Sequence, residues 1–167
     1  VIDVVVAPQD VAAYFKAPPM IDPAWLAALA RVPDAPTPPR ELELVAIYDG
    51  PDLDEVARAT GMPPAEVARV HAAATYTVDA IGFAPGFAYL SGVDRRLALP
   101  RRATPRPRVP AGSLAIAGGY TAVYPFDSPG GWHLIGRVAG AMFGDGGARL
   151  QLGERVRVVA LRAEASP

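Results

Sequence analysis

The chain has 167 residues, of which 51% are hydrophobic and 20% are charged, so it has the composition of a folded globular protein rather than a disordered one. Its formal net charge of −1 argues against a nucleic-acid-binding or membrane-surface protein, and the absence of cysteine excludes disulfides, cysteine-ligated metals and a thiol nucleophile. The 16 glycines and 19 prolines are too many turn-forming residues for a helical bundle and favour short strands joined by tight turns.

The first 40 residues read as the tail of a domain followed by a linker. An apolar, β-branched run predicts a strand at 1–6, and Asp22 followed by Pro23 predicts the start of a helix. Four prolines at 31–40 predict a stiff, extended linker, where we place a domain boundary. Because the chain begins at Val1 rather than methionine, we expect position 1 to be an internal start.

After this boundary the pattern predicts a strand and then two short helices. The strand covers 41–47. Asp52 is expected to cap the first helix, with Glu55 in the capping-box position and Gly61 just past the helix end. The second helix is expected at 64–72.

From residue 75 onward the hydrophobic period changes to two, which predicts a β-rich remainder. Pro-Gly turns are expected at 84–87 and 128–131, and Gly118-Gly119 is expected to join a hairpin. The predicted strands are 75–80, 113–117, 120–124, 133–138 and 155–161. This pattern predicts a β-barrel or sandwich that carries a small helical insert.

Common catalytic motifs are absent from the sequence. There is no phosphate-binding loop with a Gly-Lys-Ser/Thr ending, no dinucleotide fingerprint and no G-x-S-x-G elbow. The two histidines, His71 and His133, lie far apart with no carboxylate at ligand spacing, so no metal site is predicted.

The most unusual segment is 100–110, where four arginines alternate with four prolines. Guanidinium groups bind carboxylate or phosphate as a bidentate fork, although such a run is also consistent with a solvated basic stretch paired with acids of the same protein. An extended backbone directs alternate side chains to one side, so two of the four, Arg106 and Arg108, are expected to line a functional cleft. The arginines are Arg101, Arg102, Arg106 and Arg108.

Two further clusters are candidates for a site. In the cluster at 82–90, Phe87 and Tyr89 share one strand face and would form either a pocket wall or part of the core. The cluster at 124–133 holds Tyr124, Ser128 and His133, with Asp127 and Ser128 expected to orient the His133 ring.

Two aromatic residues of these clusters, Phe83 and Trp132, are expected mainly in the core. His71 is expected to be structural, as a cation near the end of a helix.

At three segments the sequence resembles the KipI family, whose members are also called the B subunit of 5-oxoprolinase or allophanate hydrolase subunit 1. That family is similar to the N-terminal half of the carboxyltransferase domain of urea carboxylase. The segments are IGFAPGFAYLSG (81–92), PRRATPRPRVPAGSLAIAGG (100–119) and YPFDSPGGWHLIGR (124–137).

The resemblance implies a mainly β (α+β) fold: a cyclophilin-like β-barrel of the carboxyltransferase type at 41–167 with a short helical insert. Residues 1–40 would then be the remnant of a small α/β domain plus the linker. It also implies a cytoplasmic protein that works in a heteromer with a homologue of KipA, the C subunit of 5-oxoprolinase, and with the A subunit as a further partner.

The implied activity is that of one component, inactive alone, of an ATP-dependent hydrolase that opens 5-oxo-L-proline to L-glutamate. His133 would transfer protons, Tyr124 or Ser128 would orient the substrate, and the ATP site would lie on or be shared with a partner protein. The expected substrate-binding residues are Arg101, Arg102, Arg106, Arg108, Arg137, Phe87 and Tyr89.

Two alternatives remain open at this point. One is carboxyl transfer from carboxybiotin to urea or a related amide, with biotin as cofactor, and the other is a non-enzymatic inhibitor that docks on a sensor histidine kinase. The chain departs from the family pattern at Tyr120, where glutamine is usual, and at Val138-Ala139, where Thr-Pro is usual.

Overall fold

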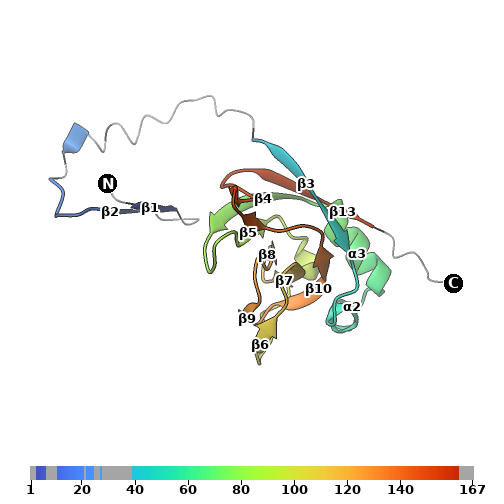
Figure 1. Cartoon of the computed structure of the whole chain (residues 1–167). Coiled ribbons are helices and arrows are strands. Elements are labelled where there is room, and N and C mark those ends of the chain that lie inside the picture. Colours follow the sequence, from blue (N-terminus) through green and yellow to red (C-terminus); the bar gives the residue numbers. More distant parts are fainter. Residues whose placement is uncertain (1–2, 7–10, 21, 25–26, 28–38, 162–167) are drawn as a thin grey trace. The chain divides into compact units, whose positions relative to one another are not determined.

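The computed structural model describes residues 3–6, 11–20, 22–24, 27 and 39–161 (Figure 1). The chain divides into two compact units, Val1–Pro39 and Arg40–Pro167. In the first unit, β1 (Asp3–Val6) pairs antiparallel with β2 (Val11–Tyr14), which confirms the described part of the first predicted strand. The predicted helix after Pro23 and the proline-rich linker lie largely outside the described residues, and the origin of this unit as a domain remnant stays a prediction.

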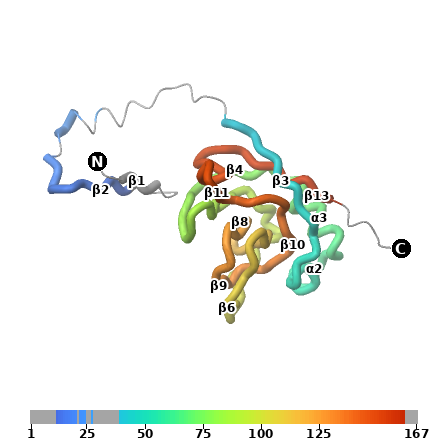
Figure 2. The backbone as a smooth tube through the Cα atoms, viewed as in Figure 1, coloured from blue at the N-terminus to red at the C-terminus, as the bar shows by residue number. Residues whose placement is uncertain are grey.

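The second unit is built on a closed seven-stranded barrel, which confirms the predicted mainly β class (Figures 1 and 2). The barrel order is β10-β3-β13-β4-β5-β8-β7, and all neighbours are antiparallel except β13 and β3, which run parallel. The barrel strands are β3 (Glu41–Ile47), β4 (Thr75–Ile81), β5 (Ala88–Ser91), β7 (Ser113–Ala117), β8 (Tyr120–Val123), β10 (His133–Val138) and β13 (Arg155–Ala160).

The predicted helical insert is present between β3 and β4. It consists of α2 (Leu53–Thr60) and α3 (Pro64–Ala73), and Gly61, with φ of 69°, ends α2 in the left-handed conformation that glycine tolerates best. A single 3₁₀ turn, η1 (Arg95–Leu97), follows β5. Within the described part of the chain, no helix combines the length and the apolarity needed to span a bilayer.

Two small ribbons complete the second unit, and one of them corrects a prediction. β6 (Arg106–Val109) pairs with β9 (Ser128–Gly130), and β11 (Phe143–Gly144) pairs with β12 (Gly147–Ala148). The Pro-Gly turn predicted at 128–131 is therefore wrong, because this segment forms strand β9 against β6. The turn predicted at 84–87 is confirmed: Gly86 has φ of 79°, and the Phe87 N–H donates to the Ala84 carbonyl.

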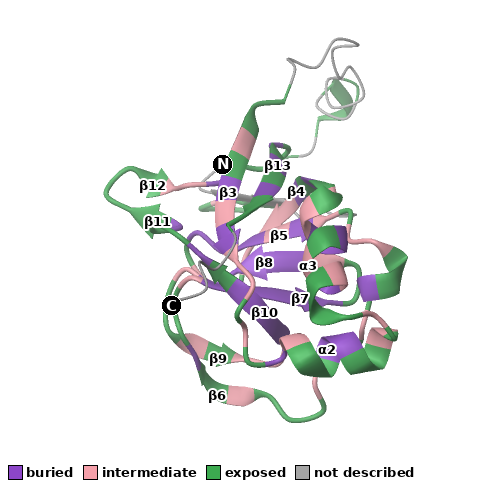
Figure 3. Ribbon diagram, turned by 90° about the vertical axis from the view of Figure 1, so that its right-hand side faces the viewer, coloured by how far each residue is buried: buried purple, intermediate pink, exposed green. Residues whose placement is uncertain are grey.

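Both faces of the barrel wall are buried at β7, as Figure 3 shows in purple. Because successive side chains alternate, Leu114 and Ile116 join one core cluster while Ala115 and Ala117 join another. The first cluster takes residues from all seven barrel strands and from both helices, so it fills the interior. The second cluster packs on the outer face of the wall, and the candidate site is built on it. It consists of Phe87, Val109, Ala115, Ala117, Ala122, Tyr124, Trp132 and Leu134.

Candidate functional site

A pocket of about 110 Å³ opens on the outer core cluster. Its walls are mainly aromatic, with one cationic side chain and a stretch of glycine backbone. The lining residues are Phe83, Phe87, Tyr89, Arg101, Tyr124, Pro129, Gly130, Gly131 and Trp132. We call this the aromatic pocket.

Local sequence explains how the aromatic pocket forms. Phe87 and Tyr89 are two positions apart, so both project to the outer face, with ring centroids 5.0 Å apart. The alanines of β7 and β8 on the same face occupy little volume and leave space for these rings. Gly130 is needed here because a Cβ at this position would lie 2.8 Å from Cζ of Tyr124. Phe87 and Tyr89 thus belong both to the outer core cluster and to the wall of the aromatic pocket, and their role in binding a ligand stays a prediction.

Arg101 is the cation of the aromatic pocket. Its guanidinium carbon lies 5.9 Å from the centroid of the Trp132 ring, within the range of a cation–π contact. Among the described residues, no carboxylate lies within ion-pair distance of Arg101, and its side chain is exposed at the pocket. Arg101 is therefore available to pair with an anionic group of a ligand.

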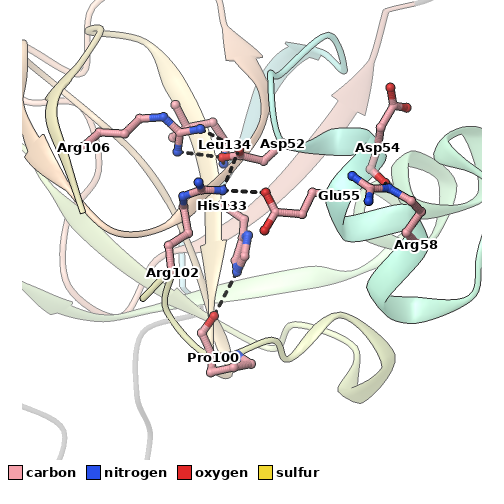
Figure 4. Close-up of polar contacts among 9 residues, drawn as sticks. All are labelled: Asp52, Asp54, Glu55, Arg58, Pro100, Arg102, Arg106, His133 and Leu134. Carbon is pink, nitrogen blue, oxygen red and sulfur yellow. Dashed lines mark hydrogen bonds and ion pairs between the residues drawn. The ribbon is translucent and has the colours of Figure 1, made fainter. Parts of the chain in front are cut away.

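The neighbouring arginines are already paired with a buried carboxylate (Figure 4). Arg106 forms a two-pronged contact with Asp52, with Nη2 2.6 Å from Oδ1 and Nη1 2.9 Å from Oδ2. Arg102 donates through Nη1 to Asp52 Oδ1 at 3.0 Å and to Glu55 Oε2 at 2.6 Å. Neither Arg106 nor Arg108 lines the aromatic pocket, so their expected place in a functional cleft stays a prediction.

The remaining two candidate arginines are paired at the surface. Arg108 binds the carboxylate of Asp127, which also accepts the N–H of Ala111. Arg137 donates to Asp49 at 2.8 Å. Arg106 and Arg108 therefore bind different carboxylates rather than one ligand group. For both residues the alternative interpretation holds, in which the arginines pair with acidic residues of the same protein.

Asp52 occupies the predicted N-cap position of α2, but its side chain does not have the predicted role. The capping box does not form, because the Asp52 side chain makes no cap hydrogen bond. Instead its carboxylate, 2% exposed, accepts from the two arginines and from the backbone N–H of Leu134 at 2.7 Å. Burial alone would raise the Asp52 pKa, but hydrogen bonds from Arg106 and Leu134 and the nearby positive charges outweigh burial and lower the pKa. The signal available in the sequence was the acidic run 49–55, which complements the arginine-rich segment in charge.

His133 is buried and does not line the aromatic pocket. Its Nε2 lies 2.9 Å from the carbonyl oxygen of Pro100, while its Nδ1 is buried without a hydrogen-bond partner (Figure 4). Asp127 is bound to Arg108, so the expected orientation of the imidazole by Asp127 and Ser128 is wrong. Because Pro100 directly precedes Arg101, His133 anchors the segment that carries the pocket's cation.

His71 is structural, as expected, but for a different reason. It is fully buried, with Nδ1 2.7 Å from the Tyr48 hydroxyl and Nε2 2.9 Å from Thr121 Oγ1. Burial lowers the His71 pKa to about 3, so the ring is neutral. The expectation that His71 is a cation at the end of the helix is therefore wrong.

Two further expectations about the aromatic residues have opposite outcomes. Trp132 is 5% exposed, so its prediction as core is confirmed, and the residue also lines the pocket. Phe83 is 58% exposed, so its prediction as core is wrong. Tyr120, one of the departures from the family pattern, packs edge-on against Tyr89 with centroids 6.1 Å apart.

The two candidate hydroxyl groups lie in different surroundings. Tyr124 lines the pocket, and burial raises its pKa, which keeps the phenol protonated at neutral pH. Ser128 donates to the Phe126 carbonyl at 3.2 Å and does not line the pocket. Of these two residues Tyr124 is thus the one that lines the pocket, although its side chain is almost fully buried and its hydroxyl lies against Gly130.

Comparison with known proteins places these features in a family. Residues 1–151 match the family described as carboxyltransferase domain, subdomain C and D. The B subunit of 5-oxoprolinase from Bacillus subtilis is 48% identical over 107 residues, covering 62% of this chain and 45% of the relative. The protein of the same name from Haemophilus influenzae is 44% identical over 126 residues, covering 72% of this chain and 59% of the relative. The chain thus spans about half the length of these curated relatives.

Solved structures and a weaker relative extend the comparison. The crystal structure of TTHA0988 superposes with a TM-score of 0.82 at 36% identity, covering 99% of this chain and 33% of that one. A putative urea carboxylase of Emericella nidulans is 31% identical over 93 residues, covering 54% of this chain and 8% of the relative.

Proposed function

From the premise that this chain belongs to the carboxyltransferase domain family, subdomains C and D, we propose that it acts as the B subunit of a 5-oxoprolinase. In this role it contributes to the ATP-dependent opening of 5-oxo-L-proline to L-glutamate. The names of the relatives at 42–48% identity support the assignment.

The observation that carries the proposal is the free guanidinium of Arg101 in the aromatic pocket. A small ring acid presents a carboxylate to such a cation and an apolar ring to aromatic walls. The sequence predicted five arginines as substrate-binding residues, and the other four form ion pairs with carboxylates of this chain, namely Asp52, Glu55, Asp127 and Asp49. Arg101 is accordingly the residue that we assign to the substrate carboxylate.

Tyr124 is the second residue with a chemical role in the proposal. The residue lines the pocket from an almost fully buried position and its phenol is protonated at neutral pH, so we assign it as the hydrogen-bond donor to the oxygen of a lactam carbonyl. Such a donor favours the build-up of negative charge on that oxygen during ring opening. His133 is proposed to position the segment that carries Arg101, since it contacts the Pro100 carbonyl and does not line the pocket.

The nucleotide and the second half of the site are proposed to come from partner proteins. The sequence contains no phosphate-binding loop. A lactam is a poor electrophile, and transfer of the γ-phosphoryl group of ATP to its oxygen would make attack by water feasible, with phosphate as the leaving group. We therefore expect the purified chain to be inactive alone and active with homologues of the A and C subunits of 5-oxoprolinase.

The test is glutamate release from 5-oxo-L-proline by the full-length protein co-expressed with these two partners, with and without ATP. In the active complex, Arg101→Ala should raise KM about 10- to 100-fold, the cost of losing one charge-assisted hydrogen bond. Arg108→Ala is the matched control, because Arg108 is exposed and bound to Asp127, and it should leave KM unchanged.

Three results would overturn the proposal: turnover without ATP, full turnover by the chain alone, or an unchanged KM in Arg101→Ala. The family name also fits carboxyl transfer, and the same cation suits a transferred carboxyl group. Biotin-dependent consumption of urea, with no glutamate released from 5-oxo-L-proline, would assign that activity instead.

A further inference from the structure

Phe83 combines three features that stability alone does not explain. Among the described residues it is the one non-glycine residue with a positive φ, 70°. Its side chain is large and 58% exposed. It also lines the aromatic pocket. A bulky L-residue in the left-handed region is strained, and strain of this kind gathers at sites of function.

The backbone around Phe83 is held in this conformation by its own loop. The Ala84 N–H donates to the Gly82 carbonyl at 2.9 Å, which closes a three-residue turn centred on Phe83, and the positive φ belongs to the rare, strained form of that turn. The Gly82 N–H donates in turn to the Phe87 carbonyl at 3.1 Å. Gly86 packs against Met142, where a Cβ would lie 2.9 Å from the carbonyl oxygen. The loop therefore fixes Phe83 in place instead of letting the strain relax.

The fixed backbone brings the Phe83 ring to the pocket. The ring meets Phe87 edge to face at 5.1 Å and Tyr124 at 6.2 Å, and both of those rings are buried. One part of Phe83 thus adjoins the buried pocket wall while more than half of the side chain is in contact with solvent. The ring contributes little to the core, but it supplies the solvent-facing part of the pocket wall.

We infer that Phe83 is a ligand-contacting, specificity-determining residue that limits the aromatic pocket to acids with a single small ring. The inference rests on the proposed function, because the ligand class is the ring acid whose carboxylate pairs with Arg101. The pocket of about 110 Å³ has room for a small ring, and Phe83 blocks a second, fused ring on the solvent side.

The test measures binding by the emission of Trp132, which lines the pocket beside Arg101. The chain has two tryptophans, so Trp25→Phe leaves Trp132 as the single reporter. The chain itself, without any partner protein, is titrated with 5-oxo-L-proline, cyclopentanecarboxylate and indoline-2-carboxylate. The first two have one ring, and the third has two fused rings.

Phe83→Gly should weaken binding of the single-ring acids about tenfold, the loss of one aromatic contact, and should improve binding of indoline-2-carboxylate relative to them. Because glycine accepts positive φ without strain, the melting temperature should stay the same or rise. The control is Phe126→Ala, which removes another exposed aromatic ring that contacts Phe143 and does not line the pocket, and it should change neither affinity nor preference.

The outcomes separate this inference from the proposed function. If cyclopentanecarboxylate binds in a Phe83-dependent way and 5-oxo-L-proline does not bind, Phe83 has the assigned role and the proposed substrate is wrong. Unchanged affinity and preference in Phe83→Gly, a marked fall in its melting temperature, or no response of Trp132 to any of the three acids would overturn the assignment of Phe83.

Discussion

Removing the Asp52 carboxylate tests how the site is held together. Asp52 lies at the start of α2 and binds Arg102, Arg106 and the N–H of Leu134. These three partners adjoin the pocket. Arg102 follows Arg101 and its N–H donates to the Gly131 carbonyl. Arg106 pairs with Gly130 between β6 and β9, and Leu134 lies two residues after Trp132. One carboxylate thus fastens the two segments that carry most of the non-aromatic pocket wall.

The cost of Asp52→Ala follows from what it leaves unpaired. The Arg106 side chain is 25% exposed and has no other carboxylate among the described residues, whereas Arg102 keeps Glu55. Breaking a buried ion pair by removing one partner costs about 3–5 kcal/mol, and the unsatisfied Leu134 N–H contributes to that sum. For a domain of this size we expect the melting temperature to fall by about 10–20 °C. Asp127→Ala is the matched control: its pair with Arg108 is exposed, so about 0–1 kcal/mol is expected.

Denaturant unfolding measures both variants, with the midpoint shift read at constant slope. In an Arg106→Met background, Asp52→Ala should cost less than in the wild type, because no guanidinium is left unpaired. A loss in Asp52→Ala as small as that in Asp127→Ala, or the same loss in both backgrounds, would refute this account of the buried pair.

The remaining predictions concern the core histidine and one pocket glycine. Burial lowers the His71 pKa to about 3 in the folded chain, so on acidification the unfolded chain takes up a proton on this histidine first. The contribution of the neutral ring to stability is therefore complete above the unfolded pKa of about 6.5 and is lost as the pH falls toward 3. We expect the free energy of unfolding, measured by urea titration, to fall by about 1.4 kcal/mol per pH unit between pH 6 and 5. The variant His71→Gln is itself less stable, and its free energy of unfolding should depend less on pH. An unchanged slope in the variant would show that His71 is not the source of the pH dependence. Gly130→Ala should displace the Tyr124 ring and weaken binding of ring acids, whereas Gly119→Ala, with nothing within 4 Å of its Cβ, should leave Trp132-monitored binding unchanged; equal effects would contradict the packing argument.

Local sequence was sufficient to predict most of the secondary structure. Strands β3, β7 and β10 and both helices lie at their predicted positions, because alternation, the N1 proline of α3 and the glycine after α2 act within a few residues. The turn at 84–87 was predictable for the same reason, since glycine accepts the positive φ at its third position. The resemblance then predicted the closed barrel, which pairs strands far apart in the sequence.

The site depended on contacts that the sequence pattern does not encode. The segment 128–131 has turn chemistry, yet pairing with β6 makes it a strand. Asp52 has the spacing of a helix cap, yet the arginines fifty and fifty-four positions later provide stronger partners for its carboxylate. Because the other arginines of the segment 100–110 form ion pairs with carboxylates, Arg101 is the one free cation of that segment. Charge pairing across such separations is decided by which strands lie side by side, and only the tertiary structure determines that.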